Sequence, residues 1–297
     1  MLLVCLAAST ACVRDSNPPH DGASVAPWVG GTAAPAPSSR PERRLAFRSS
    51  RGRWRGASWG AVWVDPRQAH VDLLVFGRRG DAWTPAYATV EQLPSSWTAA
   101  INGTFFSLRH CEPVGILVYD NGRRTWTPRV KRWYGAVERP VAKLDRGYLA
   151  VLDDGTACIG SSSGRTAPEQ SAIVARERGQ RVRCLLGGGG PLVSHGRVAV
   201  SAASLARAGF DERSGLRESE PLRRCGVGLT VDGRILLLTC GLEGGGLSLR
   251  DFATLFVRQG ARQAIFLDCG SSTAMRQDSG WATGGRPVPV WLVAGRR

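Results

Sequence analysis

Lysine is almost absent from this sequence: only Lys131 and Lys143 accompany the arginines among its 39 basic residues. The formal net charge of +15 is therefore carried almost entirely by arginine spread along the chain. A nucleic-acid-binding protein would combine such charge with a binding motif or interleaved aromatic residues, and neither is present. The imbalance is typical of codon bias, so we expect no nucleic-acid partner, whereas an acidic substrate is easily accommodated.

The sequence also lacks any apolar run of the ~20 residues that a membrane-spanning helix needs. Its apolar N-terminus, MLLVCLAASTAC, is shorter and ends in small residues, as in an export signal. Ser9-Thr10-Ala11-Cys12 resembles a bacterial lipobox, in which the cysteine is lipidated. We predict a signal peptide and lipobox over residues 1–12, with Cys12 lipidated. The alternative is an apolar N-terminus without a targeting role.

These features predict an exported bacterial protein, held in the cell envelope by a lipid anchor or else periplasmic or secreted. No Cys-x-x-Cys pair occurs, which argues against a structural zinc site or a thioredoxin-like centre. An even number of cysteines beyond residue 12 favours disulfides in an oxidising compartment, although their pairing does not follow from the sequence. These cysteines are Cys111, Cys158, Cys184, Cys225, Cys240 and Cys269.

Helical periodicity is scarce, whereas short β patterns are frequent. One clear helix is predicted over residues 248–261, capped by Ser248 and ended by Gly260, and a short one near 201–209. Three hairpin turns are predicted, at Asn121-Gly122, Asp154-Gly155 and Asp232-Gly233. The expected fold class is therefore α+β: a single strand-rich domain with a mixed or antiparallel sheet and few packed helices.

Composition divides the chain into three parts. Beyond the signal, residues 13–45 are rich in Pro, Ala, Gly and Ser, which is typical of a disordered tether. Residues 46–297 contain the β patterns and the predicted helices, so we expect the folded domain there.

Two glycine-containing segments could carry chemistry. Asn102-Gly103 is followed by aromatic residues, so its amide could be held at the edge of a cleft, although Asn-Gly is also an ordinary turn. The run Gly187–Gly190 would let the backbone approach a ligand closely, with its N–H groups facing an anion. Its structural alternative is a loose bulge.

Two charged residues lie at strand boundaries. Arg224 precedes a buried strand and could present its planar fork to a phosphate or carboxylate, or could be a surface residue. Asp268 ends the apolar strand Ala264–Leu267 and is followed by a Gly-Ser turn. It could serve as a general base, sugar-hydroxyl acceptor or metal ligand, or could simply cap the turn.

Gly160-Ser161-Ser162-Ser163-Gly164 formally matches the nucleophile elbow of serine hydrolases. An elbow needs a helix after it, and the sequence that follows, RTAPEQ with Pro168, predicts no helix start. We therefore do not expect a serine nucleophile.

The order of these segments is more informative than any one of them. NG-x-FF, GGGGPLV-x-HG, R-x-G-V-G, GLSLRDFATLF-x-x-x-GA, LD-x-GSS and RPVPVWLV follow one another along the chain. Together they resemble the phosphodiester glycosidase family of "uncovering enzyme"-like domains, over roughly residues 58–295. In that family the LD motif usually reads LDGGGSS, so here Cys269 replaces a glycine in a shorter loop. Cys225 stands in place of a hydroxyl residue, and Cys240 in place of an acid.

The resemblance implies a hydrolase acting on a sugar-1-phosphodiester, of the N-acetylglucosamine-1-phosphodiester type, in envelope or extracellular polysaccharide. It implies three catalytic candidates: Asp268 to activate water or stabilise the cationic sugar, Arg224 on the phosphate, and Asn102. It also suggests a disulfide between two of the three motif cysteines. The alternative is a noncatalytic glycan-binding envelope lipoprotein of the same fold.

The remaining candidates would bind the substrate or act as reserve acid/base groups. The substrate-binding candidates are Gly187, Gly188, Gly189, Gly190, Ser271 and Ser272, and the reserve groups are Glu112 and His110. No cofactor is implied; a divalent cation shared by Asp268 and Asn102 is allowed, but no ligand spacing demands one.

Overall fold

The computed structural model describes residues 45–79, 82–83, 86–108, 112–128, 145–210, 218–277, 282–283 and 285–297. The described residues all lie in one compact unit, Arg44–Arg297. The predicted export signal, the lipidation site Cys12 and the tether up to residue 44 lie outside the described residues. Of the helices described, none has the length and apolar character to cross a membrane.

Strands dominate this unit, and all strand pairs among the described residues are antiparallel. The largest sheet has seven strands in the spatial order β1 (Phe47–Trp54), β2 (Ala57–Val64), β15 (Ile235–Gly244), β14 (Arg224–Thr230), β16 (Ala261–Phe266), β12 (Pro191–Ser194) and β13 (Arg197–Val198). The expected strand-rich domain is thus confirmed, and its sheets are antiparallel rather than mixed.

Two five-stranded sheets accompany it. The β9 sheet has the order β10 (Ala157–Ser161), β9 (Gly147–Leu152), β11 (Val182–Gly187), β7 (Leu117–Tyr119) and β8 (Arg124–Trp126). The β6 sheet has the order β18 (Ala282–Thr283), β17 (Met275–Arg276), β6 (Trp97–Asn102), β19 (Val290–Arg296) and β3 (Ala69–Val75). A small pair is formed by β4 (Arg78–Arg79) and β5 (Ala82–Trp83). The three predicted hairpin turns join β7 to β8, β9 to β10 and β14 to β15.

The two predicted helices are confirmed, and a third was missed. The described helices are α1 (Ala167–Arg178), α2 (Ala202–Arg207) and α3 (Leu249–Arg258), with 3-10 turns η1 (Val90–Gln92) and η4 (Gly270–Ser272). Ser248 caps α3 by accepting a hydrogen bond from the Asp251 N–H. Helix α1 begins despite Pro168, because Thr166 and Glu169 form a capping box and proline is tolerated in a first turn.

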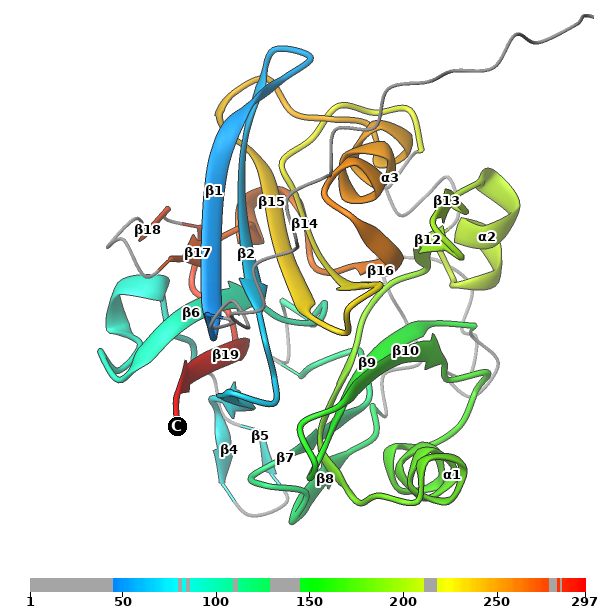
Figure 1. The fold of residues 1–297 in the computed structure, drawn as a ribbon. Helices are drawn as coiled ribbons and strands as arrows, with labels where there is room; N and C mark the ends of the chain where they lie inside the picture. Colours follow the sequence, from blue (N-terminus) through cyan, green and yellow to red (C-terminus); the bar gives the residue numbers. More distant parts are fainter. Residues whose placement is uncertain are drawn as a thin grey trace, which may run out of the picture. The chain divides into compact units, whose positions relative to one another are not determined.

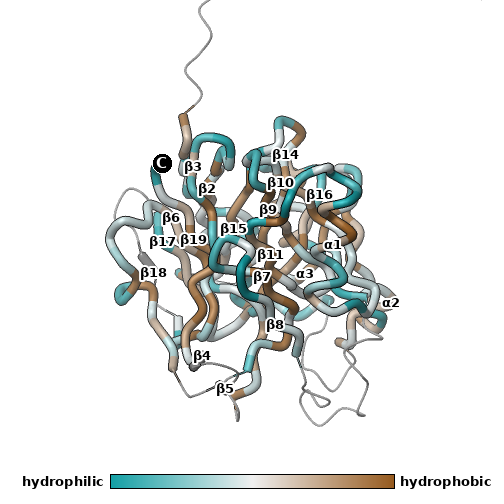
Figure 2. Tube along the Cα trace, turned by 90° about the horizontal axis from the view of Figure 1, so that it is seen from below, coloured by the Kyte–Doolittle hydropathy of each residue, from teal (hydrophilic) through white to brown (hydrophobic). Residues whose placement is uncertain are grey.

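The inner faces of the three large sheets share one apolar core, to which Val62, Ile101 and Leu149 contribute from one sheet each. Helix α3 packs Phe252 and Phe256 against the opposite face of the seven-stranded sheet (Figure 1). Apolar residues follow the strands and hydrophilic residues gather in the connecting turns (Figure 2). Alternating side chains therefore bury both faces of the central strands, and polar groups can gather only where these strands end.

Candidate active site

The end of β16 is the point where the candidate segments meet. Leu267 continues the buried strand, and Asp268 is the first residue with an exposed part. On the tetraglycine side, the Gly189 N–H donates to the Phe266 carbonyl at 2.8 Å. On the β14 side, the Leu267 N–H donates to the Cys225 carbonyl at 3.0 Å.

The first candidate segment joins the same turn from β6. The Asp268 N–H donates to the Gly103 carbonyl at 3.2 Å, and the Asn102 side-chain amide donates to the Asp268 carbonyl at 2.7 Å. The Gly270 N–H donates to the Arg223 carbonyl at 2.9 Å. Three segments far apart in the sequence, around residues 102–103, 189 and 223–225, are thus hydrogen-bonded to residues 266–270.

The Asp268 carboxylate is largely buried, with 13% of its side chain exposed. It accepts a hydrogen bond from the Ser272 hydroxyl, which in turn accepts one from Arg286 Nε at 2.8 Å. Arg286 Nη2 lies 3.6 Å from Asp268 Oδ2, which is too long for a hydrogen bond but close enough for attraction between the charges. Asp268 is therefore oriented by a short relay, Arg286 to Ser272 to the carboxylate.

This environment changes the acidity of Asp268. Burial raises the pKa of its carboxyl from 3.8 to about 6, although Ser272 and Arg286 oppose the rise. Burial prevails because only one hydrogen bond and one loose ion pair replace the lost water. A carboxyl with a pKa near 6 can accept a proton at neutral pH more readily than an ordinary aspartate, as a general base requires.

Asn102 reaches the site but has a different task from the one expected. It is fully buried, and while its amide N–H donates to Asp268, its carbonyl oxygen accepts from the Ala274 N–H at 3.0 Å. Both polar ends therefore hold the turn after β16, which makes Asn102 a positioning residue. The Asn102 oxygen, which was the expected amide ligand of a shared cation, accepts this hydrogen bond from Ala274. Among the described residues, no group of three His, Cys, Asp or Glu side chains could hold a metal ion.

The tetraglycine segment is neither an anion-binding loop nor a loose bulge. The N–H groups of Gly187, Gly188 and Gly189 donate to the carbonyls of Ile116, Gly147 and Phe266, each at 2.8 Å. The segment carries the chain from β11 in one sheet to β12 in another, where Pro191 pairs with Ile265.

Close packing explains the four glycines. A Cβ at residue 187 would lie 2.7 Å from the Ile116 nitrogen, and one at 188 would lie 2.8 Å from the Phe266 carbonyl. At 189 it would approach the Phe266 ring to 2.3 Å. Side chains larger than hydrogen would push the sheets apart, so Gly187–Gly189 serve packing rather than phosphate binding.

Arg224 is also structural in this arrangement, contrary to the prediction. Its exposed fraction is 0%, and it donates from Nε to the Leu247 carbonyl at 3.0 Å and from Nη2 to the Glu220 carbonyl at 2.5 Å. Nη1 is buried without a hydrogen-bond partner among the described residues. The guanidinium therefore ties β14 to the chain before α3 and cannot reach a ligand at the surface.

The remaining candidate site residues differ in how far their side chains are exposed. Ser272 is buried within the relay, so its hydroxyl contacts Asp268 and Arg286 rather than a sugar. Ser271 is exposed on the turn beside it and remains suited to substrate contact. Glu112 lies next to a bridge between Phe106 and Pro113, and its carbonyl accepts from the Ser107 N–H at 2.9 Å. His110 lies outside the described residues.

The sequence analysis missed Arg286. Its guanidinium lies 4.9 Å from the centre of the Phe106 ring. Its backbone N–H donates a hydrogen bond to the Ser271 carbonyl at 2.7 Å. With 30% of its side chain exposed, it is the cation at Asp268 that solvent and ligand can reach. The signal was the RPVPVWLV motif: β19 is antiparallel to β6, so residues before β19 lie near the end of β6.

The motif cysteines converge but are not joined. All five described cysteines, at 158, 184, 225, 240 and 269, are free and buried thiols, so the expected disulfide beside the site is not formed. Cys225 packs in the central core, whereas Cys240 and Cys269 pack on the α3 side of the sheet. The Cys225 thiol instead donates to the Asp268 carbonyl at 2.9 Å.

Cys225 and Cys269 also share a hydrogen bond. Burial raises thiol pKa values, but the neighbouring Cys225 side chain and the Arg224 guanidinium lower the pKa of Cys269 below its ordinary value. Once one thiolate has formed, burial and its charge raise the pKa of the other. This pair lies beneath the turn of Asp268 rather than at its exposed side.

The serine motif has the flanks of a nucleophile elbow after all, since β10 precedes it and α1 follows. The absence of a helix was therefore the wrong reason to discount it. The central Ser162 is nevertheless buried, and its hydroxyl donates to the Arg146 carbonyl at 3.1 Å. This hydroxyl is occupied by the backbone and is not presented to a substrate.

Comparisons with known proteins give the fold and the family of the chain. No curated protein sequence matches the chain. The catalytic domain of zebrafish N-acetylglucosamine-1-phosphodiester alpha-N-acetylglucosaminidase, auto-inhibited by its pro-peptide, is similar in fold at 16% identity, with a TM-score of 0.65 over 86% of each chain. A hypothetical protein from Synechocystis is similar at 17% identity, with a TM-score of 0.53 over 84% of this chain and 62% of that one.

At such identities the structural likeness shows the fold alone. The family is shown by sequence: the model of the phosphodiester glycosidase family matches residues 95–294, which include Asn102, Asp268, Arg286 and most of the three sheets. Membership supports a glycosidase-type function, for which a carbohydrate-related substrate is plausible. This chain belongs to the phosphodiester glycosidase family.

Proposed function

We propose that this protein hydrolyses a sugar-1-phosphodiester at its glycosidic bond, releasing the sugar and a phosphomonoester. The observation that carries the proposal is the Asp268 carboxylate, held by Ser272 and Arg286 at the partly exposed end of β16. This carboxylate stands where the segments around residues 102–103, 189, 223–225 and 286 meet, next to a cation that an anionic substrate can reach. A substrate of the N-acetylglucosamine-1-phosphodiester type is the one named for the zebrafish relative.

Phosphate binding falls to Arg286 in this proposal, in place of Arg224. Arg286 is partly exposed and oriented by Ser272 and by the Phe106 ring, so its remaining N–H groups can donate to phosphate oxygens. The exposed Ser271 lies directly beside it and adds a hydroxyl donor. An anion bound to Arg286 would replace part of the electrostatic attraction between Arg286 and Asp268. Both residues would therefore take part in binding and catalysis.

Asp268 acts on water. In its ionised form the carboxylate takes a proton from a water molecule whose oxygen attacks the anomeric carbon, and its charge stabilises the developing positive charge on the sugar. The bond from the anomeric carbon to the phosphate oxygen breaks, and the phosphomonoester leaves with the electron pair. Because a phosphate is a good leaving group, the step requires little protonation by a second acid; Glu112 is the described residue in reserve.

The proposal includes export. The apolar start of the sequence and its lipobox-like Ser9–Cys12 support a location in the bacterial cell envelope, where polysaccharide phosphodiesters would be the accessible substrates. Cell fractionation with metabolic labelling by a fatty-acid analogue tests this part separately. A Cys12→Ala variant that keeps the label and the membrane fraction would contradict lipidation at that residue.

The central experiment measures sugar release by the full chain from UDP-N-acetylglucosamine and from a panel of sugar-1-phosphodiesters. Asp268→Asn should lower turnover at least about 100-fold, because it removes the base but preserves the size of the side chain. Asp120→Asn is the matched control: Asp120 is an exposed acid in the β7–β8 turn with a left-handed φ of 55°, which asparagine adopts readily.

The outcomes separate the two function classes. Turnover that depends on Asp268 supports the hydrolase. Tight binding of the panel without sugar release supports the noncatalytic glycan-binding lipoprotein. Full turnover by Asp268→Asn would show that the chemistry takes place elsewhere.

A further inference from the structure

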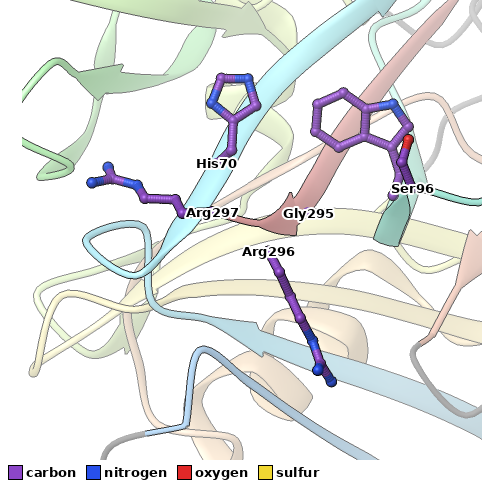
Figure 3. Close-up of a pocket in the computed structure, with 6 residues that line it drawn as sticks. His70, Ser96, Gly295, Arg296 and Arg297 are labelled. Carbon is purple, nitrogen blue, oxygen red and sulfur yellow. The ribbon is translucent and has the colours of Figure 1, made fainter.

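A second cleft lies at the other end of the β6 sheet. It has a volume of about 470 Å³ and opens at the end of β19, where Figure 3 shows His70, Arg296 and Arg297 extending in different directions around Gly295. Its lining residues are His70, Ser96, Trp97, Gly295, Arg296 and Arg297. Aromatic rings and cations thus line one space, which shares no lining residue with the candidate active site.

Strand pairing explains how the cleft forms. Gly295 of β19 pairs with His70 of β3 on one side and with Trp97 of β6 on the other. The two rings stack, with centroids 5.6 Å apart and planes 24° apart. A Cβ at Gly295 would come within 3.0 Å of the Ser96 carbonyl and 3.2 Å of the Trp97 ring. The missing side chain at Gly295 therefore leaves room for the His70 and Trp97 rings, and these two rings form one wall of the cleft.

The charges around this wall are predominantly positive. Arg296 and Arg297 line the cleft, and Arg297 Nη2 donates to the Pro66 carbonyl at 3.3 Å, which holds it near the rim. Behind the rings, Arg183 has an exposed fraction of 8% and no hydrogen-bond partner among the described residues for Nε or Nη2.

His70 presents a neutral ring within this field. Burial, followed by the charges of Arg183 and Arg297, lowers the pKa of His70, while Asp72 opposes them. Burial raises the pKa of Asp72, and this single acid stands against the charges of Arg183 and Arg297 at His70. At neutral pH the wall is therefore an apolar pair of rings flanked by arginines.

The cleft is separate from the candidate active site. Trp97 is the first residue of β6 and Asn102, beneath Asp268, is the last. A strand of this length spans ~17 Å, which is several times the reach of a hydrogen bond. A ligand in one site does not occupy the other.

We propose that this cleft binds an acidic saccharide, with a sugar ring packed against the partly exposed His70 and Trp97 rings and its carboxylate or phosphate contacting Arg297. Flat aromatic rings match the C–H face of a sugar, and guanidinium groups match oxyanions with paired hydrogen bonds. The proposal does not depend on hydrolysis at Asp268. It adds a binding site that would hold an acidic glycan on the protein whichever reaction takes place.

Isothermal titration calorimetry of the full chain tests the proposal with named probes. Tri-galacturonate supplies carboxylates and glucose 6-phosphate supplies a phosphate; methyl-esterified tri-galacturonate and glucose are their neutral counterparts. At least one acidic probe should bind, and its neutral counterpart should bind at least about ten-fold more weakly, as expected from the loss of a charge-assisted hydrogen bond. If neither acidic probe binds, the proposal is wrong.

Variants locate the binding. Arg297→Gln and Trp97→Ala should each weaken it about ten-fold or more. Arg297→Gln lies at the last residue and changes no core contact, so it remains informative if Trp97→Ala fails to fold. Arg123→Gln, an exposed arginine in the β7–β8 turn, is the matched control and should bind normally.

Two further measurements separate the alternatives. Arg286→Gln should retain binding, because it removes the cation of the candidate active site and leaves the cleft unchanged; loss of binding in that variant would assign the probe to the candidate active site and overturn the proposal. A single-stranded oligothymidylate is the competing anionic ligand. If it binds through Trp97 and Arg297 while the acidic sugars do not, the cleft is a nucleic-acid site instead.

Discussion

The buried and the exposed sides of the turn at residues 266–270 use similar residue types for opposite purposes. On the buried side, Asn102, Arg224 and the tetraglycine satisfy backbone groups of neighbouring strands. On the exposed side, Asp268 and Arg286 face each other at 3.6 Å without a direct hydrogen bond. Polar residues at strand ends are thus equally conspicuous in sequence, but only those with unsatisfied capacity can act on a ligand.

This contrast also separates the two arginines. Arg224 is fully buried and fixed by carbonyl oxygens, whereas Arg286 keeps 30% of its side chain exposed. Substitutions on the buried side should therefore alter stability, and substitutions on the exposed side should alter catalysis.

The largest effect is expected from Arg224→Met. Removing the guanidinium takes one donor from the Leu247 carbonyl and one from the Glu220 carbonyl and changes the packing at a fully buried position, so the free energy of unfolding should fall by about 3 kcal/mol. Urea denaturation measures this loss. Arg223→Met, at the exposed neighbour, should change it by less than ~0.5 kcal/mol. A stable Arg224→Met protein with weakened phosphate binding would reverse the assignment.

Arg286→Gln should separate catalysis from stability. Losing the accessible cation should lower kcat for a sugar-1-phosphodiester about 100-fold, equivalent to ~2.7 kcal/mol of transition-state stabilisation. The free energy of unfolding should change by no more than ~1 kcal/mol, since the side chain is partly exposed. Steady-state kinetics and urea denaturation provide both numbers. Arg250→Gln, which removes an exposed ion pair with Glu218, is the control and should keep full activity.

Gly189→Ala tests the packing interpretation of the tetraglycine. Its added methyl group would lie 2.3 Å from the Phe266 ring, so we expect a loss of about 2 kcal/mol in unfolding free energy. Gly190→Ala is the matched comparison, because its nearest neighbour would lie 3.4 Å away, and it should cost less than ~1 kcal/mol. Equal stability of the two variants, with phosphate binding lost in Gly189→Ala alone, would restore the anion-binding interpretation.

The smallest effects concern pH. If ionised Asp268 is the base, turnover should rise as pH increases through the pKa of about 6 and then level off. Ser272→Ala removes a hydrogen bond that favours the ionised form, so the pKa and the rising limb should move to higher pH. A pH–rate profile of both proteins tests this, and an unmoved limb would separate Ser272 from the titration.

Stability should change in the opposite sense over the same range. Folded Asp268 binds a proton more readily than the unfolded residue, so the free energy of unfolding falls as pH rises from 3.8 to about 6. Asp268→Asn should remove this contribution. Urea denaturation at several pH values measures it.

Several parts of the fold could be predicted because their signals are local. The hairpin at Asp232-Gly233 and helix α3 were correctly placed from turn residues, the Ser248 cap and an apolar stripe. Helix α1 was missed because Pro168 was taken as a helix breaker, although its place in the first turn makes it harmless.

The site was predicted in outline only. The order of motifs identified Asp268 and the segments around it, yet four of the expected ligand contacts are structural supports: Asn102, Gly187–Gly189, Arg224 and Ser272. The Asn102 oxygen is occupied by the Ala274 N–H and the Ser272 hydroxyl by Arg286. Both partners lie beyond the local sequence, so the residue alone does not show whether its polar group is free. Arg286 was overlooked because nothing in its neighbours shows that β19 pairs with β6.

By itself, the sequence determined the strand-rich domain, its hairpins, its capped helices and the carboxylate at the end of an apolar strand. These follow from side-chain alternation, turn chemistry and capping, which act over a few residues. Tertiary structure alone decided which polar groups are already satisfied and which cation stands beside Asp268. Hydrogen bonding and desolvation depend on partners brought together by packing, and it is this packing that sets the pKa of about 6.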